Sequence, residues 1–485
     1  MKALKVFISL TFCLTIPIII QAQDKTDALR YSQIYFGGTA RSLGLAGAFG
    51  SAGADFFSAS VNPAGIGLYK SSEITFSPSF YSGNTFTNYN ETETEDQKFN
   101  VNINNVGMVW NFDIKKDKEG EDSDYGWNNF QLAFGINRLN NFNNRIIIQG
   151  NSKSSSLLDV FVSQANGLKP ENLDKFGSAL AFNTYLIDTL VGGNTEYYSV
   201  LPNSGVLQRK LLTTSGGINE MVINLAANYS DKLYIGGTLG LPIIRYYEQS
   251  QYYEIDNADT LPNFKSFTYS EDLATSGSGF NFKFGIIYRL NDYVRLGAAV
   301  QTPTFFTLKD SYSKKIKSNL ETANYQDNSP LGVFNYELMT PMRATGNIAF
   351  IIGRLGMLNV DYEFVDYSDS KLNSSNYKFF DENESIRNSY TVANNIRVGG
   401  EIVLAPFSVR GGYAYYGSPY KTGLNDGKKS FVTFGMGVKE KGYFIDLAYI
   451  YSLSKEDYYL YPNVSSPAHN KMINHNVVLT FGLKY

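Results

Sequence analysis

The chain has 485 residues, 43 glycines and a formal net charge of −3 at pH 7, and 15% of its residues are aromatic. The near-neutral charge, without a basic cluster, excludes the strongly basic surface by which proteins usually bind nucleic acid. Tyr (36) and Phe (34) far outnumber Trp (2), and this aromatic content is typical of a membrane β-barrel and unusual for a soluble enzyme.

The first 22 residues are predicted to be a cleaved signal peptide. Lys2 and Lys5 precede an apolar run over 6–20. This run of about 15 residues is short for a membrane-spanning helix, and the small residue Ala22 after it suits a signal peptidase. The only cysteine, Cys13, lies in the run, so the mature chain is expected to lack disulfides, Cys–metal sites and Cys nucleophiles. No later apolar run is long enough for a transmembrane helix, so any membrane span must be a β-strand.

The next segment, residues 23–70, is rich in glycine and alanine and has no period of two. Small residues allow a backbone to pack closely against another backbone or a ligand. We expect this segment to plug the inside of a β-barrel formed by residues 71–485. Its phenylalanines are candidates for an apolar ligand pocket, although ordinary packing of the plug explains them equally well. They are Phe36, Phe49, Phe56 and Phe57.

Residues 71–485 are predicted to form one all-β domain, because strand-like segments follow one another without a linker-like break. Large apolar residues occupy every second position in several segments, for example 280–288 and 443–451. A strand with one face in lipid and the other in a wet lumen has this period. The count is about 14 strands, and an even number closes an antiparallel transmembrane barrel without an exposed edge. The expected strands are 72–82, 99–112, 127–140, 219–230, 232–255, 265–290, 293–317, 332–352, 355–369, 390–404, 407–419, 429–439, 443–455 and 471–485.

The connections between the later strands alternate between short and long. Very short turns are expected at 231–232, 291–292, 353–354, 405–406 and 440–442. Longer polar loops are expected near 256–264, 318–331, 370–389, 421–428 and 455–470. Turns at one end and long loops at the other are typical of a bacterial outer-membrane barrel, with the loops outside the cell.

The longest connection, 141–218, is expected to be an extracellular loop that contains short helices. Apolar residues recur in it at helical spacing before and after Pro170. They are Leu157, Leu158, Phe161, Val162, Ala165, Leu173, Phe176, Ala179 and Leu180. Two interpretations remain open: the helices cap the mouth of the barrel, or their apolar faces form a landing groove for a hydrophobic ligand.

Two stretches of the plug segment resemble the hatch of the FadL/TodX family of outer-membrane transporters for long-chain fatty acids and other hydrophobic compounds. They are GGTARSLGLAGAF at 37–49 and Asn62-Pro63-Ala64-Gly65. Later segments at 296–303, 341–346 and 360–368 are similar to strands of the same family. The resemblance spans the mature chain and implies a 14-stranded barrel with an N-terminal hatch, in which Asn62, Pro63 and Ala64 match the hatch motif.

The resemblance also implies a function in the outer membrane of a Gram-negative cell. It implies transport of a hydrophobic small molecule, in the first place a long-chain fatty acid, by a ligand-triggered shift of the hatch. The ligand would then leave sideways into the outer-membrane lipid at a kink in the third strand, which Gly126 or Gly135 would supply. No cofactor or metal is expected. Two alternatives are a FadL-like barrel that acts as a scaffold or shuttle for secreted proteins, with a protein partner, and a general porin.

Several charged side chains are expected to face the lumen by strand parity: Lys283, Arg295, Arg343, Arg397, Arg410, Asp361, Glu363, Glu401 and Asp446. They either form an ionic network that joins wall and plug, or leave one cation free for a fatty-acid carboxylate, which Arg binds in bidentate geometry. Arg343, Arg397 and Arg410 are the candidates for that carboxylate.

The two histidines, His469 and His475, are expected to be interfacial or solvated, because a lone pair is weak support for a metal or haem site. No Ser–His–carboxylate arrangement stands out in the sequence, so we do not expect an enzyme.

Overall fold

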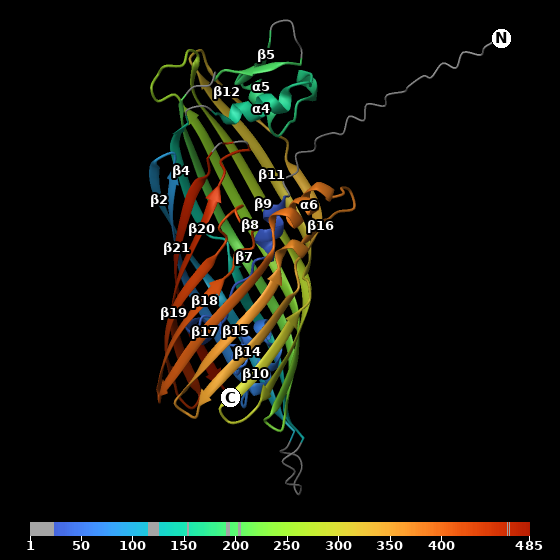
Figure 1. Ribbon diagram of the computed structural model, residues 1–485, viewed down its shortest axis with the longest axis vertical. Helices are drawn as coiled ribbons and strands as arrows, with labels where there is room; N and C mark the ends of the chain where they lie inside the picture. The colour runs from blue at the N-terminus through green and yellow to red at the C-terminus, as the bar shows by residue number, and fades with distance from the viewer. Residues whose placement is uncertain are drawn as a thin grey trace, which may run out of the picture.

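Strands wound into a tall closed cylinder form most of the molecule (Figure 1). The structure is a computed structural model that describes residues 24–114, 126–152, 155–190, 195–201, 205–462, 464 and 466–485; the predicted signal peptide lies outside them. The first strand, β1 (Glu73–Tyr89), pairs with the last, β21 (Ala468–Lys484), and this pairing closes the ring. The wall is antiparallel and has 14 strands, so the predicted barrel is confirmed.

Ten wall strands are continuous and four are split in two. The other continuous strands are β2 (Thr92–Asp113), β7 (Val206–Tyr229), β8 (Leu233–Ile255), β9 (Phe264–Arg289), β17 (Val392–Leu404), β18 (Phe407–Tyr416), β19 (Lys429–Lys439) and β20 (Tyr443–Tyr458). The split strands are β3 (Trp127–Asn141) with β4 (Asn144–Ser152), β10 (Val294–Gln301) with β11 (Phe305–Leu320), β13 (Gly332–Met339) with β14 (Arg343–Ile352), and β15 (Gly356–Asp366) with β16 (Lys371–Asn373).

The remaining elements are not part of this ring of wall strands. Two short pairings are β12 (Asn324–Asn328) with β11, and β5 (Ile187–Thr189) with β6 (Tyr197–Ser199). The helices are α1 (Lys25–Ser32), α2 (Ala40–Gly44), α3 (Ser58–Val61), α4 (Leu157–Ala165), α5 (Ser178–Asn183) and α6 (Phe380–Ser389), with the 3-10 helices η1 (Pro63–Leu68), η3 (Pro170–Asn172) and η4 (Tyr367–Asp369). No helix of the described residues is both long and apolar enough to cross a membrane.

Side chains of the wall alternate between an apolar outer face and a polar inner face. The outer side chains of Phe282, Tyr362 and Phe434 are 44%, 44% and 49% exposed. The inner side chains of Asn224 and Asp361 are fully buried. A continuous exposed belt of aromatic and aliphatic groups is stable against lipid and not against water. The strands therefore cross a membrane with the faces that the period-two pattern predicts.

The two ends of the cylinder differ as the connection lengths predict. The β7–β8 connection, 230–232, contains Ser230 and Asp231 with φ of 55° and 53°, the left-handed backbone that a type I′ turn requires at its two central residues. We call the end of the cylinder that carries this turn the turn end; it lies at the bottom of Figure 1. The opposite end, which carries α4 and α5, is the loop end.

Several strands are longer at the loop end than the sequence indicated. β1 and β2 continue through residues 83–98, while β4 and the first part of β7 occupy 144–152 and 206–218 of the predicted loop. The sequence at 92–98 is Thr-Glu-Thr-Glu-Asp-Gln-Lys. It has no apolar face, because this part of the hairpin lies beyond the apolar belt, so the period-two signal is missing there.

The N-terminal segment, which we define as residues 24–69, lies within the ring. Its hydrogen bonds reach wall strands on every side: β2, β3, β7, β9, β10, β14, β15, β17, β19 and β21. Only a segment inside a closed cylinder can contact so many of its strands. Near the loop end, α1 packs in an apolar cluster that includes Leu29, Tyr31, Tyr246 and Phe306.

Candidate functional site

The Asn62-Pro63-Ala64 motif lies on glycines of two neighbouring strands, β8 and β9. Asn62 is fully buried, and its side-chain Oδ1 accepts a hydrogen bond from Ala64 N at 3.2 Å, which starts helix η1. A Cβ at Gly285 would lie 2.0 Å from Asn62 Oδ1, and one at Gly236 would lie 2.5 Å from the Pro63 carbonyl. The wall therefore admits this motif only because glycine occupies both positions.

Other parts of the N-terminal segment also rest on cross-strand glycine pairs. Gly399 and Gly412 face each other on β17 and β18, and a Cβ on either would lie within 2.6 Å of the backbone of Leu45. Gly107 and Gly135 form a second pair under the ring of Phe56. These pairs show how a broad segment fits in the barrel without widening it.

A buried ionic cluster joins the segment to the wall near the turn end. Arg410 contacts Glu401 and Asp446, each at 2.5 Å, and Arg41 of the N-terminal segment contacts Glu401 at 3.1 Å. Arg41 also donates to the carbonyl of Ala54 at 3.1 Å. The two carboxylates and two guanidiniums balance in charge. Arg410 is therefore already paired and is not available to bind a ligand carboxylate.

A second cluster contains the other two predicted cations. Arg343 contacts Glu363 at 2.9 Å and donates to the carbonyl of Ser32 at 2.7 Å. Arg397 has only longer ion pairs, 3.7 Å to Asp361 and 3.9 Å to Glu363. Its Nε makes no hydrogen bond with any part of the chain that the structure describes. Among the three candidate arginines, Arg397 is therefore the least satisfied.

Asp361 contacts the N-terminal segment as well as Arg397. Its carboxylate accepts hydrogen bonds from the backbone N–H groups of Phe49 and Gly50, both at 3.0 Å. On the opposite wall, Lys283 pairs with Glu220, which also accepts a hydrogen bond from Ser60 at 2.9 Å. The network of wall and segment charges that strand parity suggested is thus present, and it reaches both sides of the lumen.

Two of the four candidate phenylalanines lie together beside these arginines. A cavity of about 30 Å³ is lined by Phe36, Phe57, Val61, Leu139, Arg343 and Arg397, among others. Phe49 and Phe56 lie elsewhere: Phe49 packs with Leu45 and Met357, and Phe56 packs on the Gly107–Gly135 pair. The cavity has room for a water molecule but is far too small for a hydrocarbon ligand.

The cavity adjoins a break in the barrel wall. The β2–β3 ladder ends at Asn105↔Asn137, and the β3–β7 ladder shifts register between Arg138 and Asn140. Beyond this point β4 leaves β2 and packs over the β1–β2 hairpin, where Arg145 contacts Asp96 at 2.5 Å. Within the described residues, 92–104 of β2 therefore pair with β1 alone.

The break does not lie at either glycine named from the sequence. Gly135 is in regular register with Gly107 and Val222, and Gly126 precedes the strand. The irregular residues beside the cavity are 138–143, where β3 ends and β4 begins, and a second register shift lies between Trp127 and Asn129, just after Gly126. Asparagines dominate 138–143, and their side chains hydrogen-bond nearby backbone in place of the ladder.

The loop end is closed by a cap, residues 155–190 and 195–201, which includes α4 and α5 (Figure 1). The apolar face of α4 is buried: Leu158 is 0% and Phe161 is 3% exposed. It packs on the inner wall with Tyr252, Phe267 and Tyr461, and burial raises the pKa of Tyr461. In this state the helices cover the mouth and present no open groove.

The histidines lie on β21, away from this site. The ring of His475 stacks on Tyr449, and its Nδ1 is hydrogen-bonded with the Tyr449 hydroxyl at 2.7 Å. His469 Nδ1 contacts the Asp457 carboxylate at 2.6 Å. Over the described residues there is no group of three His, Cys, Asp or Glu side chains that could hold a metal ion.

Sequence reasoning missed two parts of the site. Glu220 is fully buried and anchors both Lys283 and Ser60, and its position opposite the apolar face of 221–229 could have placed it in the lumen. The glycine pairs could not be found from the sequence, because their pairing depends on register between strands.

Comparisons with known proteins agree with this architecture. No protein-family model and no curated protein matches the chain. Among solved structures, a Pseudomonas aeruginosa FadL homologue matches with a TM-score of 0.54 and 12% identity, covering 93% of this chain and 99% of that chain. The P. putida toluene transporter TodX matches with a TM-score of 0.52 and 11% identity, covering 93% and 99%. At these identities the likeness establishes the fold that the hatch-like sequence implied.

Proposed function

We propose that this chain, which has the fold of the FadL homologue and of TodX, transports hydrophobic compounds across the outer membrane of a Gram-negative cell. The observation that carries the proposal is the cavity between Phe36, Phe57, Arg343 and Arg397, which adjoins the break between β2 and β4. A closed lumen with a partly apolar cavity beside a break in the strand pairing suits a molecule that passes from the cavity into lipid.

In the proposed mechanism residues 23–70 act as a movable hatch, after removal of the signal peptide 1–22. The cavity of about 30 Å³ must expand for any hydrocarbon to enter. Entry would separate Phe36 and Phe57 of the segment from Leu139 of the wall, next to the break. The ligand would then leave sideways past the unpaired edge of β2 at 92–104. Binding to apolar surface supplies the free energy for the shift, and the mechanism uses no cofactor.

A long-chain fatty acid is the first candidate for the substrate, and a neutral hydrocarbon of the kind that TodX carries is the second. A fatty acid needs a cation for its carboxylate, and Arg397 is the arginine with the longest ion pairs. A neutral hydrocarbon needs only Phe36 and Phe57. The variant Arg397→Met separates the two: it should lower oleate uptake far more than toluene uptake.

A reversible lock tests whether the hatch moves. A Cβ at residue 285 would lie 3.0 Å from Asn62 Cγ, which suits a disulfide between Asn62→Cys and Gly285→Cys. Cells with the double variant should lose uptake of labelled oleate or toluene when oxidised and regain it on reduction, while each single variant should not respond. Uptake that continues through a formed disulfide would contradict the moving hatch. Large steady conductance in planar bilayers would favour a porin, and capture of a secreted protein without lipid uptake would favour a scaffold.

A further inference from the structure

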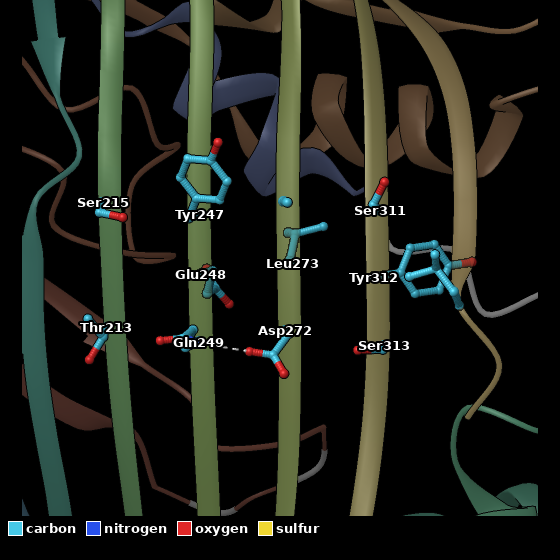
Figure 2. Close-up of a pocket in the computed structure, with 12 residues that line it drawn as sticks. Thr213, Ser215, Tyr247, Glu248, Gln249, Asp272, Leu273, Ser311, Tyr312 and Ser313 are labelled. Atoms are coloured by element: carbon cyan, nitrogen blue, oxygen red, sulfur yellow. Dashed lines mark hydrogen bonds between the residues drawn. The ribbon is translucent and has the colours of Figure 1, made fainter. Parts of the chain in front are cut away.

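The outer wall of β7, β8, β9 and β11 carries a polar groove above the apolar belt. The belt on this side ends at Phe280 and Phe305, which pair across β9 and β11 and are both 46% exposed. Farther toward the loop end the outward positions become small and hydroxylated. They enclose a groove of about 470 Å³, lined by Thr213, Ser215, Tyr247, Gln249, Asp272 and Ser313, among others. Figure 2 shows Thr213, Gln249, Asp272 and Ser313 at one level across the four strands.

Exposed cations flank this groove on both sides along the strands. Arg245 and Lys309 lie at one level between the belt and the groove, because both pair with Ser276. Arg209, Lys315 and Lys317 lie on the far side, nearer the loop end. Lys309 and Lys315 are separated by about 20 Å at ~3.3 Å per residue.

These five cations have no charged partner of their own. No side-chain hydrogen bond or ion pair joins any of them to another described residue, in contrast to Arg343 and Arg410 of the lumen, which have close carboxylate partners. Two acidic side chains line the groove. Asp272 accepts a hydrogen bond from Gln249 at 3.1 Å (Figure 2), and Glu248 lies 3.8 Å from Arg30 of the N-terminal segment. The outer face here is thus a cationic surface just beyond the hydrocarbon boundary, where lipid headgroups lie.

We propose that this groove binds the headgroup of a phosphorylated glycolipid from the adjoining membrane leaflet. The hydroxyl groups of the groove, the Asp272–Gln249 pair and the ring of Tyr247 match the hydroxyls and faces of sugars. The flanking cations match phosphates attached at the two ends of the sugar unit, and the acyl chains continue down over Phe280 and Phe305. Charge complementarity at two levels, with a hydroxylated groove between them that also carries the Asp272 and Glu248 carboxylates, selects a phosphorylated sugar over a simple phospholipid.

The first test measures binding of diphosphoryl lipid A to the purified protein by native mass spectrometry, with lipid A stripped of both phosphates as the reference probe. The double variant Arg245→Gln/Lys309→Gln should bind diphosphoryl lipid A about tenfold more weakly than the wild type. Removal of each cation is expected to weaken binding by roughly a factor of five or less. Lys455→Gln/Lys471→Gln is the matched control, since these exposed lysines pair directly on β20 and β21 at the same end of the barrel. The control should change binding less than twofold.

A second variant tests the contribution of the groove without changing the flanking cations. Ala274→Trp fills the groove, where Ala274 lies between Tyr247 and Ser311, and leaves all five cations in place. It should weaken diphosphoryl lipid A about fivefold and leave phosphatidylglycerol binding unchanged. Circular dichroism verifies that each variant is folded. The proposal would be overturned if the cation variant and its control lost the same amount of affinity for diphosphoryl lipid A. It would also be overturned if the cation variant and the Ala274→Trp variant both bound lipid A as tightly as the wild type.

Discussion

The lumen is closed at two levels by different mixtures of contacts. The N-terminal segment is held by ion pairs and hydrogen bonds, such as Arg41 to Glu401 and Phe49 N–H to Asp361, as well as by apolar clusters. The cap at the loop end is held by an apolar core around Leu158 and Phe161. A polar contact can be exchanged for another polar contact at little net cost, whereas apolar packing is lost in proportion to the area exposed. Under the proposed function, the segment is therefore expected to move and the cap to stay in place as a seal.

The largest expected effect comes from breaking the ionic cluster at the turn end. Arg410→Ala leaves Asp446 without its cation and Glu401 with Arg41 alone. Loss of one partner of a buried ion pair costs about 3–5 kcal/mol, so thermal unfolding in detergent should shift markedly and ion conductance should rise. Arg245→Ala, on the exposed outer face, should stay within about 0.5 kcal/mol of the wild type. A wild-type unfolding curve for Arg410→Ala would show that the cluster does not hold the segment.

The next effect concerns the cap and should leave the lumen closed. Leu158→Ala removes a fully buried side chain from the apolar core and should lower the free energy of unfolding by about 3 kcal/mol. Conductance should not change, because the N-terminal segment still fills the barrel. The half-exposed Leu168 offers a matched Leu→Ala control. A rise in conductance with Leu158→Ala would mean that the cap, and not the segment, is the seal.

A glycine substitution in the wall tests whether displacement of the segment opens the lumen. Gly285→Ala places a Cβ 2.0 Å from Asn62 Oδ1, so the motif must shift, at a cost of about 1–3 kcal/mol. Gly346→Ala is the control, because a Cβ at that position meets nothing within 4 Å. Single-channel recordings should show transient openings for the first variant only. Identical traces for both would argue that the motif tolerates displacement without opening the lumen.

The smallest effect is expected from the motif itself. Asn62→Ala removes the side-chain hydrogen bond to Ala64 N that starts η1, and loss of such a cap costs about 1 kcal/mol. Hydrogen exchange should accelerate over 62–69 and not over the cap. The exposed Asn328 provides an Asn→Ala control. Faster exchange in the cap as well would show that the two closures are coupled.

The sequence was informative wherever a wall strand touches lipid. Residues 280–288 and 443–451 alternate because lipid demands large apolar groups on one face, and both lie in strands with the predicted orientation. Residues 92–98 and 144–152 stand beyond the belt and have water or protein on both faces, so no alternation marks them as strands.

The site was only partly predictable for a different reason. Strand parity placed Arg343, Arg397 and Arg410 in the lumen, since parity follows from local sequence. Which carboxylate each arginine contacts depends on the register between neighbouring wall strands, which no local pattern encodes. That Phe36 and Phe57 share one cavity while Phe49 and Phe56 do not depends on how the N-terminal segment sits against the wall. The contacts between segment and wall join residues hundreds of positions apart.

The pairing of β1 with β21 has a consequence for biogenesis. Glu73 at the start of β1 lies beside Lys484 at the end of β21, with an ion pair of 3.4 Å between them. This seam cannot form until the final strand has been synthesised and delivered. Because the N-terminal segment is bonded to strands all round the cylinder, it must be loaded before the seam shuts. Assembly in the membrane therefore has a fixed order, with the interior filled first and the ring sealed last.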